Sequence, residues 1–108
     1  MAHADNEFVD FIIDQMSDPL VYAKKMFGGY GIYRDGAFFA VVDDGVLYLK
    51  TNDRTRGWYL SEGMGPFRPN PKQTLKSYFE VPEHVLDDAV LFREKAEESW
   101  RIAGTEKF

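Results

Sequence analysis

Two Asp-Gly dipeptides, Asp35-Gly36 and Asp44-Gly45, stand nine residues apart and limit the fold of this chain more than any other sequence feature. Runs of β-branched and aromatic residues surround both of them. Asp-Gly favours a tight two-residue hairpin loop because both central residues of that loop need a positive φ. The spacing therefore predicts a three-stranded antiparallel meander over residues 25–51.

The alternation of side chains assigns residues to the two faces of this meander. If both loops contain two residues, one face is suited to close packing of a helix and carries Gly29, Gly31, Tyr33, Phe38, Ala40, Val42, Leu47 and Leu49. The other face is aromatic: Tyr30, Phe39 and Tyr48 line up across three strands, with Lys50 opposite Phe39. A three-residue bulged turn over residues 43–45 is the open alternative, and it would exchange the faces of the third strand.

Segments outside the meander predict helices and short strands. Apolar residues recur at helical spacing over residues 5–17 and again in a last helix, for which Asp87 is the expected N-cap. Residues 54–60 are typical of a short helix, residues 78–81 of a strand, and Phe67 of a short extended piece. This order predicts an α+β fold of two layers, with N- and C-terminal helices packed on an antiparallel β-meander sheet.

Composition predicts one soluble domain. The 108 residues are enough for one modest core, and the 44% apolar content with mixed charges disfavours disorder. The absence of cysteine excludes disulfides and thiolate chemistry. No apolar run is long enough for a membrane span, and the N-terminus carries acids where a signal peptide carries basic residues. We therefore expect a cytoplasmic protein.

Basic residues gather in the middle of the chain, although the net charge is −5. Residues 50–76 contain six of them, namely Lys50, Arg54, Arg56, Arg68, Lys72 and Lys76, against two acids. One interpretation pairs these side chains with the acidic helices of the same or a neighbouring subunit. The other makes the segment a local patch for an anion or a nucleic acid.

The sequence offers no catalytic residue, metal site or cofactor site that we would assign. The two histidines, His3 and His84, have no evident partner in the sequence, and no serine lies in a G-x-S-x-G context. The glycines of residues 27–31 run into a hairpin, whereas a phosphate-binding loop opens a helix. We therefore expect that this chain is not an enzyme and that its glycines serve close backbone approach or a bend.

Several segments of the chain resemble the N-terminal domain of the TfoX/Sxy family. They are KMFGGYGIY at residues 25–33, followed by Asp35-Gly36, Phe39-Ala40, LYLK at residues 47–50 and SYFEVPE at residues 77–83. The resemblance covers nearly the whole chain and implies one domain over residues 1–108, with a secretion-chaperone-like, TfoX-N-like fold. The founding members carry a second, C-terminal domain, which we expect this chain, ending at Phe108, to lack.

The resemblance also implies a link to the regulation of natural competence, and it supplies no catalytic residues. The family motif residues are interpreted as structural: Met26 lies within the motif, Asp35 and Gly36 make a turn, Gly28, Gly29 and Gly31 allow close approach, and Phe27, Phe39 and Tyr48 are core aromatics. The chain is therefore expected to be a regulatory domain that binds a protein partner, with a homodimer expected and an accessory role in transcription of competence genes.

A second hypothesis makes the chain a nucleic-acid or anionic-ligand binder. It uses the aromatic face together with the neighbouring basic side chains: Tyr30, Phe39, Tyr48, Lys50, Arg54, Arg56, Arg68, Lys72 and Lys76. Aromatic rings on a sheet with basic neighbours can stack bases, and such binding weakens steeply with salt.

Overall fold

The computed structural model describes residues 2–26 and 28–105, with side chains from Asn6 onward. Phe27, predicted as a core aromatic, lies outside the described residues. The elements in chain order are α1 (Ala2–Met16), β1 (Val21–Met26), β2 (Gly29–Arg34), β3 (Ala37–Asp43), β4 (Val46–Lys50), α2 (Arg56–Ser61), β5 (Pro66–Asn70), β6 (Gln73–Glu80), α3 (Glu83–Leu86) and α4 (Ala89–Thr105). None of the helices in the described part of the chain combines the length and apolarity that a bilayer crossing requires.

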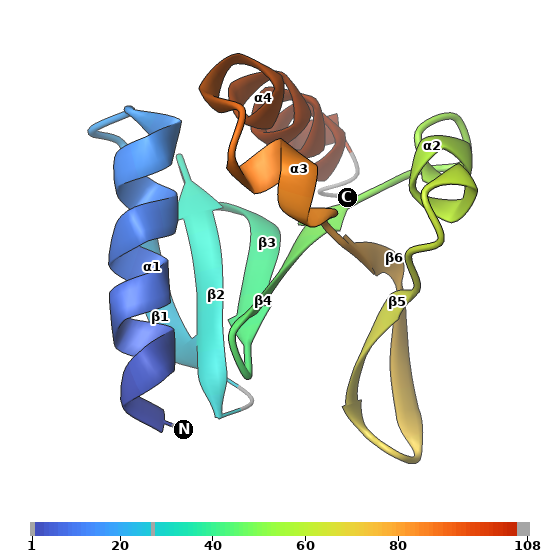
Figure 1. The fold of residues 1–108 in the computed structure, drawn as a ribbon, viewed down its shortest axis with the longest axis horizontal. Coiled ribbons are helices and arrows are strands. Elements are labelled where there is room, and N and C mark those ends of the chain that lie inside the picture. Colours follow the sequence, from blue (N-terminus) through green and yellow to red (C-terminus); the bar gives the residue numbers. More distant parts are fainter. Residues whose placement is uncertain (1, 27, 106–108) are drawn as a thin grey trace.

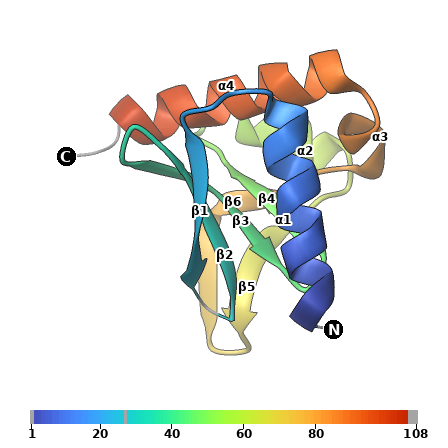
Figure 2. The ribbon, with the colours of Figure 1, turned by 90° about the vertical axis from the view of Figure 1, so that its left-hand side faces the viewer.

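Six strands in the described residues form one antiparallel sheet in the order β1-β2-β3-β4-β6-β5. Helices α1 and α4 lie along one face of this sheet, and the β5–β6 hairpin extends away from them (Figure 1). In the turned view, α4 crosses above the strands and α1 runs beside β1 and β2 (Figure 2). The predicted α+β fold with terminal helices on an antiparallel sheet is confirmed.

Both Asp-Gly dipeptides form the two-residue loops that their composition predicts. Arg34 pairs with Ala37 around the first loop, and Asp43 pairs with Val46 around the second. The φ angles are 54° and 75° at Asp35 and Gly36, and the second loop repeats them almost identically. These positive values are the ones that Asp-Gly tolerates and most other residue pairs do not. The alternative of a three-residue bulged second turn is wrong.

The meander has one strand more than predicted. β1 precedes β2 and pairs with it over six consecutive residue pairs, from Val21 opposite Arg34 to Met26 opposite Gly29. Its sequence, VYAKKM, contains two lysines and an alanine, residues of low strand propensity. The extended conformation of β1 therefore depends on its pairing with β2, and the strand propensity of its own residues contributes little.

A β-bulge corrects the predicted faces of the sheet. Tyr33 faces Phe38 as expected, but Ile32 then faces Ala40, which leaves Phe39 as an extra residue in β3. An extra residue reverses the alternation beyond it. Tyr30 and Ile32 therefore lie on the face covered by helices, whereas Tyr33 and Phe38 lie on the opposite face.

Two apolar clusters follow from this arrangement. The larger one fills the space between the sheet, α1 and α4, and includes Phe39, Leu49, Phe92 and Ile12. The smaller one lies on the opposite face under the β5–β6 hairpin, where Val41, Phe67 and Tyr78 are buried. Both faces of the sheet are therefore partly buried. Of the two clusters in the described residues, the larger one contains helix residues, and the smaller one contains strand residues only.

The family-motif glycines have two different roles. A Cβ on Gly29 would lie 2.1 Å from the backbone oxygen of Val42, and one on Gly31 would lie 2.7 Å from Sδ of Met26. Close approach is therefore confirmed for these two glycines, but not by the expected helix. The backbone of β3 approaches Gly29, and the side chains of Met26 and Phe38 approach Gly31. Gly28 has nothing within 4 Å of such a Cβ, and its φ of +81° is the feature that requires glycine.

The C-terminal half agrees with prediction in its elements and differs in detail. α2 begins at Arg56, after Asn52 Oδ1 accepts hydrogen bonds from the backbone N–H groups of Arg54 and Thr55. α4 begins at Ala89, and the side chain that accepts from its first turn is Asp88, which bonds the Leu91 N–H at 3.1 Å. The predicted N-cap Asp87 is therefore wrong by one residue, because Asp87 is the C-cap residue of the short helix α3.

Tyr59 gives a prediction about the core. Its side chain is fully buried, and its hydroxyl makes no well-formed hydrogen bond among the described residues. Burial, followed by the charge of Glu98, raises the pKa of this phenol, and a weaker polar contact with the Ser99 side chain lowers it by less. Tyr59→Phe removes an unsatisfied polar group, so we expect the free energy of unfolding at neutral pH to rise by about 1 kcal/mol in urea denaturation.

The same substitution should alter the response to alkali. The pKa of Tyr59 is higher in the folded chain than in the unfolded chain, where it has its ordinary value of 10.0. The stability that the neutral phenol contributes is therefore fully present below pH 10.0 and is lost as the pH rises above that value. The Tyr59→Phe variant should lose less stability above pH 10 than the wild-type protein does. An equal loss in both proteins would contradict the assignment.

Candidate functional site

A row of four aromatic rings crosses the sheet face that carries neither α1 nor α4. The rings of Tyr22 and Tyr33 have centroids 5.5 Å apart, Tyr33 and Phe38 follow at 5.2 Å, and Phe38 and Tyr78 at 5.1 Å. Each ring comes from a different strand, namely β1, β2, β3 and β6. We call this set, Tyr22, Tyr33, Phe38 and Tyr78, the aromatic row.

Exposure decreases along the aromatic row. Tyr22, on the edge strand, is 39% exposed, Tyr33 and Phe38 are half-buried, and Tyr78, in β6, is 7% exposed. The Tyr78 hydroxyl donates to the carbonyl oxygen of Phe38 at 3.0 Å, which anchors the buried end. The interplanar angles between neighbours are 11° to 30°, so each ring stacks against the next one with an offset or a tilt. The accessible part of the row is the Tyr22 end and the ring edges.

Two lysines place their charge on the aromatic row. Lys24 Nζ lies 5.2 Å from the Tyr33 ring centroid, and Lys50 Nζ lies 5.3 Å from that of Tyr78. Both distances fall within the range of a cation–π interaction. We call the sheet face that carries neither α1 nor α4 the uncovered face. It combines the apolar area of the row with positive charge over two of its rings.

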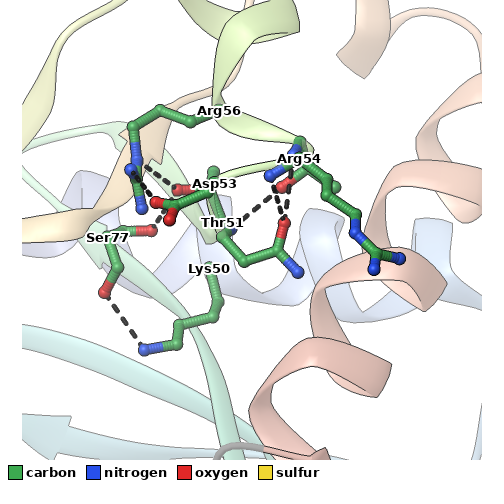
Figure 3. Close-up of polar contacts among 8 residues, drawn as sticks. Lys50, Thr51, Asp53, Arg54, Arg56 and Ser77 are labelled. Atoms are coloured by element: carbon green, nitrogen blue, oxygen red, sulfur yellow. Dashed lines mark hydrogen bonds and ion pairs between the residues drawn. The ribbon is translucent and has the colours of Figure 1, made fainter.

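Polar contacts bring two of the predicted basic residues together beside the row (Figure 3). Lys50 Nζ donates to Ser77 Oγ at 3.1 Å, and the buried Thr51 hydroxyl donates to the Ser77 carbonyl oxygen at 2.9 Å. Arg56 Nε then donates to Thr51 Oγ1 at 3.3 Å. The end of β4, the start of α2 and β6 are thus joined through one buried threonine, and Lys50 and Arg56 share this junction.

Three of the other predicted basic residues lie elsewhere. The Arg54 side chain points away from Lys50 and Arg56 in Figure 3 and lines a shallow hollow together with Glu98 of α4. Arg68 donates to Thr74 Oγ1 at 3.0 Å, across the β5–β6 hairpin. Lys72 lies in the turn of that hairpin, where its backbone N–H bonds Asn70. The six basic residues therefore do not form one patch.

A shallow concavity continues from the junction along β6. It is lined by Arg56, Thr74, Leu75, Lys76, Ser77 and Tyr78. Arg56 also forms an ion pair with Asp53 at 2.9 Å, so its charge is partly compensated within its own loop.

The predicted line of Tyr30, Phe39 and Tyr48 does not exist, because the bulge at Phe39 separates them. Phe39 is 1% exposed in the helix-covered core, and the Tyr30 hydroxyl donates to Asn6 of α1 on that same side. Tyr48 lies on the opposite face and packs on Phe67 with ring centroids 4.7 Å apart. Burial, and then the charge of Glu80, raise the pKa of Tyr48.

Sequence reasoning also missed a polar anchor at the other end of the sheet. Arg34 Nε lies 3.0 Å from Asp18 Oδ2, and its guanidinium carbon lies 4.0 Å from the centroid of the Trp100 ring. Trp100 Nε1 donates to the Arg34 carbonyl oxygen at 2.9 Å, and Glu97 accepts from the guanidinium at 3.2 Å. These contacts join β2, the loop after α1, and α4 around a cavity of about 240 Å³.

His84 has a partner that the sequence did not reveal. Its Nε2 lies 2.7 Å from Glu62 Oε1, although 22 residues separate the two in the chain. The histidine side chain is 58% exposed, and the nearby Ser61 hydroxyl donates to the Trp58 carbonyl oxygen. Within residues 2–26 and 28–105, no group of three or more side chains suited to a metal ion is found.

Comparisons with known proteins give a family match and a relative. Residues 15–103 match the TfoX N-terminal domain. The chain is also similar to the DNA transformation protein TfoX1 of Aliivibrio fischeri (strain ATCC 700601 / ES114), with 28% identity over 87 residues. That alignment covers 77% of this chain and 39% of the relative, so the chain spans well under half of that protein's length. The match over most of its residues shows that the chain belongs to the TfoX N-terminal domain family.

Proposed function

We propose that this chain is a non-enzymatic regulatory domain in the control of DNA uptake and that it acts by binding a protein partner. The aromatic row carries the proposal, because it presents apolar rings on a sheet face that no helix of the described chain covers. Exposed aromatic residues are enriched where proteins bind one another. Membership of the family and the name of its DNA transformation relative support the competence setting.

The arrangement of the rings favours a protein partner over stacked bases. A base-stacking platform needs free ring faces, whereas the rings of the row lie against one another and under Lys24 and Lys50. The net charge of −5 also repels a phosphate backbone at long range. A protein surface can instead use the ring edges and the exposed Tyr22 end.

Tyr22→Ser should lower the frequency of natural transformation. We expect at least a tenfold decrease in cells whose own copy of the gene is deleted and replaced by this variant, because the most exposed ring of the row is removed. Tyr22 lies on an edge strand, so the fold should be retained, and circular dichroism checks this. The measurement is the number of transformants per viable cell after addition of marked DNA.

Leu60→Ser is the matched control for this experiment. Leu60 is 57% exposed on α2 and is not part of the aromatic row, so its loss removes an exposed apolar group without changing a ring of the row. We expect wild-type transformation with this variant. Wild-type transformation with a stably folded Tyr22→Ser protein would contradict the proposed function.

A second copy of the chain is the partner expected from sequence, and we propose it as one occupant of the uncovered face. Light scattering should then give twice the 12.5 kDa chain mass. Tyr22→Ser should shift the mass toward that of one chain, whereas Leu60→Ser should not. A single-chain mass for the wild-type protein at high concentration would exclude the homodimer and leave a different protein as the partner.

A further inference from the structure

The two edges of the sheet differ in their capacity to accept another strand. β5 at one edge contains Pro66 and Pro69 and pairs with β6 through two register shifts. β1 at the other edge contains neither proline nor glycine, and its six pairs with β2 show no shift. Prolines and bulges block strand addition, whereas a regular edge permits it. β1 is therefore the edge that remains competent to pair.

The backbone of β1 has groups that point away from β2. The Val21 N–H donates to Asp18 of the preceding loop at 3.2 Å. Backbone groups of an antiparallel strand point alternately toward and away from the neighbouring strand. The N–H groups of Ala23 and Lys25, which alternate with Val21, are therefore directed outward along the edge.

The side chains of β1 restrict what can pair with it. Tyr22, Lys24 and Lys25 are exposed, and the strand carries no acid. Lysines on an edge disfavour pairing with a second copy of the same strand, because like charges then approach each other. An acidic strand would instead neutralise both lysines. An aromatic residue opposite Tyr22 would also extend the aromatic row by one ring.

We propose that β1 binds an extended acidic segment of a protein partner as an additional antiparallel strand. Two adjacent acids lie opposite Lys25 and Lys24, and an aromatic residue two positions further along the segment lies opposite Tyr22. Main-chain hydrogen bonds supply affinity in this mode of recognition, and the side chains supply specificity. This inference rests on the proposed function, since it names the chemistry of the partner and the part of the face that it contacts.

A synthetic peptide tests the proposal directly. The acetylated and amidated heptapeptide TEEVFVT places its two glutamates opposite Lys25 and Lys24 and its phenylalanine opposite Tyr22. We expect binding that protects the amides of Ala23 and Lys25 from hydrogen exchange, measured by NMR on the full chain. Absence of binding, or binding without protection of these two amides, overturns the proposal.

A charge swap provides the matched control. The double variant Lys24→Glu/Lys25→Glu should bind TEEVFVT at least tenfold more weakly, and it should bind the peptide TKKVFVT better than the wild-type chain does. The variant Lys72→Glu/Lys76→Glu makes the same change of charge on the β5–β6 hairpin and should leave the affinity for TEEVFVT within twofold. An equal loss of affinity for TEEVFVT in both double variants would show that the net charge of the chain causes the effect, and it would overturn the proposed binding to β1.

The transformation assay separates this inference from the proposed function. If cells carrying Lys24→Glu/Lys25→Glu transform normally while those carrying Tyr22→Ser do not, the edge is not the partner site, although the proposed function stands. If both variants lose transformation and the charge-swapped variant binds only TKKVFVT, the edge is supported as the partner site.

Discussion

Gly29→Ala is expected to lower the free energy of unfolding by about 3 kcal/mol, or to prevent folding, because overpacking against backbone allows little relaxation. The added Cβ would lie 2.1 Å from the Val42 oxygen and 3.1 Å from the Asp43 Cα. Both atoms belong to the main chain of β3, so relief requires separation of β2 from β3. Urea denaturation monitored by tryptophan fluorescence measures the change.

Gly57→Ala is the control for this substitution. Gly57 lies within α2, and a Cβ added there meets nothing within 4 Å. Alanine is a better helix former than glycine, so this variant should gain about 0.5–1 kcal/mol. A Gly29→Ala protein as stable as the wild type would contradict the close approach of Gly29 to the Val42 carbonyl oxygen.

The contrast between the turns and the bulge shows which parts of this fold can be predicted from sequence. Asp35-Gly36 and Asp44-Gly45 encode their loops locally, because these residue types accept the positive φ that the loops need. The bulge at Phe39 has no such local signal. It arises from the pairing of two strands and from the packing of helices on one of them. Alternation counted across it therefore assigned the wrong face to β2, Phe38 and Phe39. Residues of β3 and β4 beyond Phe39, such as Ala40 and Leu49, lie on the helix-covered face as predicted.

The candidate site was predictable only where local chemistry determines it. Basic residues and aromatic strands were visible in the sequence, and Lys50 indeed lies beside an aromatic ring of the uncovered face. Tyr22 and Tyr33 were missed as members of that face because β1 was not expected and the register was wrong. The pairing of His84 with Glu62 depends on how α2 and α3 meet, which no spacing in the sequence reveals.

Phe39→Ala is the second large effect, and it tests the corrected face assignment. Phe39 is 1% exposed beneath α1 and α4, and deletion of a buried phenylalanine side chain costs about 3–5 kcal/mol. Tyr48 lies on the opposite face and is half-buried, so Tyr48→Ala should cost about half as much or less. The two variants therefore compare the loss of unfolding free energy on the two faces of the sheet, at residues of the adjacent strands β3 and β4.

The physical basis of this comparison is what covers each ring. Phe39 packs in the helix-covered core and borders the cavity beside Arg34, so its removal enlarges a space that the sheet and helices cannot close without moving together. Tyr48 rests mainly on Phe67 of the β5–β6 hairpin and is bordered by solvent, so water can replace part of the lost contact. A charged residue at Phe39 should therefore unfold the chain, whereas release of an intact monomer from a dimer is not expected at this position. If denaturation instead showed Tyr48→Ala to be the more costly of the two alanine variants, the helices would have to cover the opposite face of the sheet, and the bulge at Phe39 would be wrong.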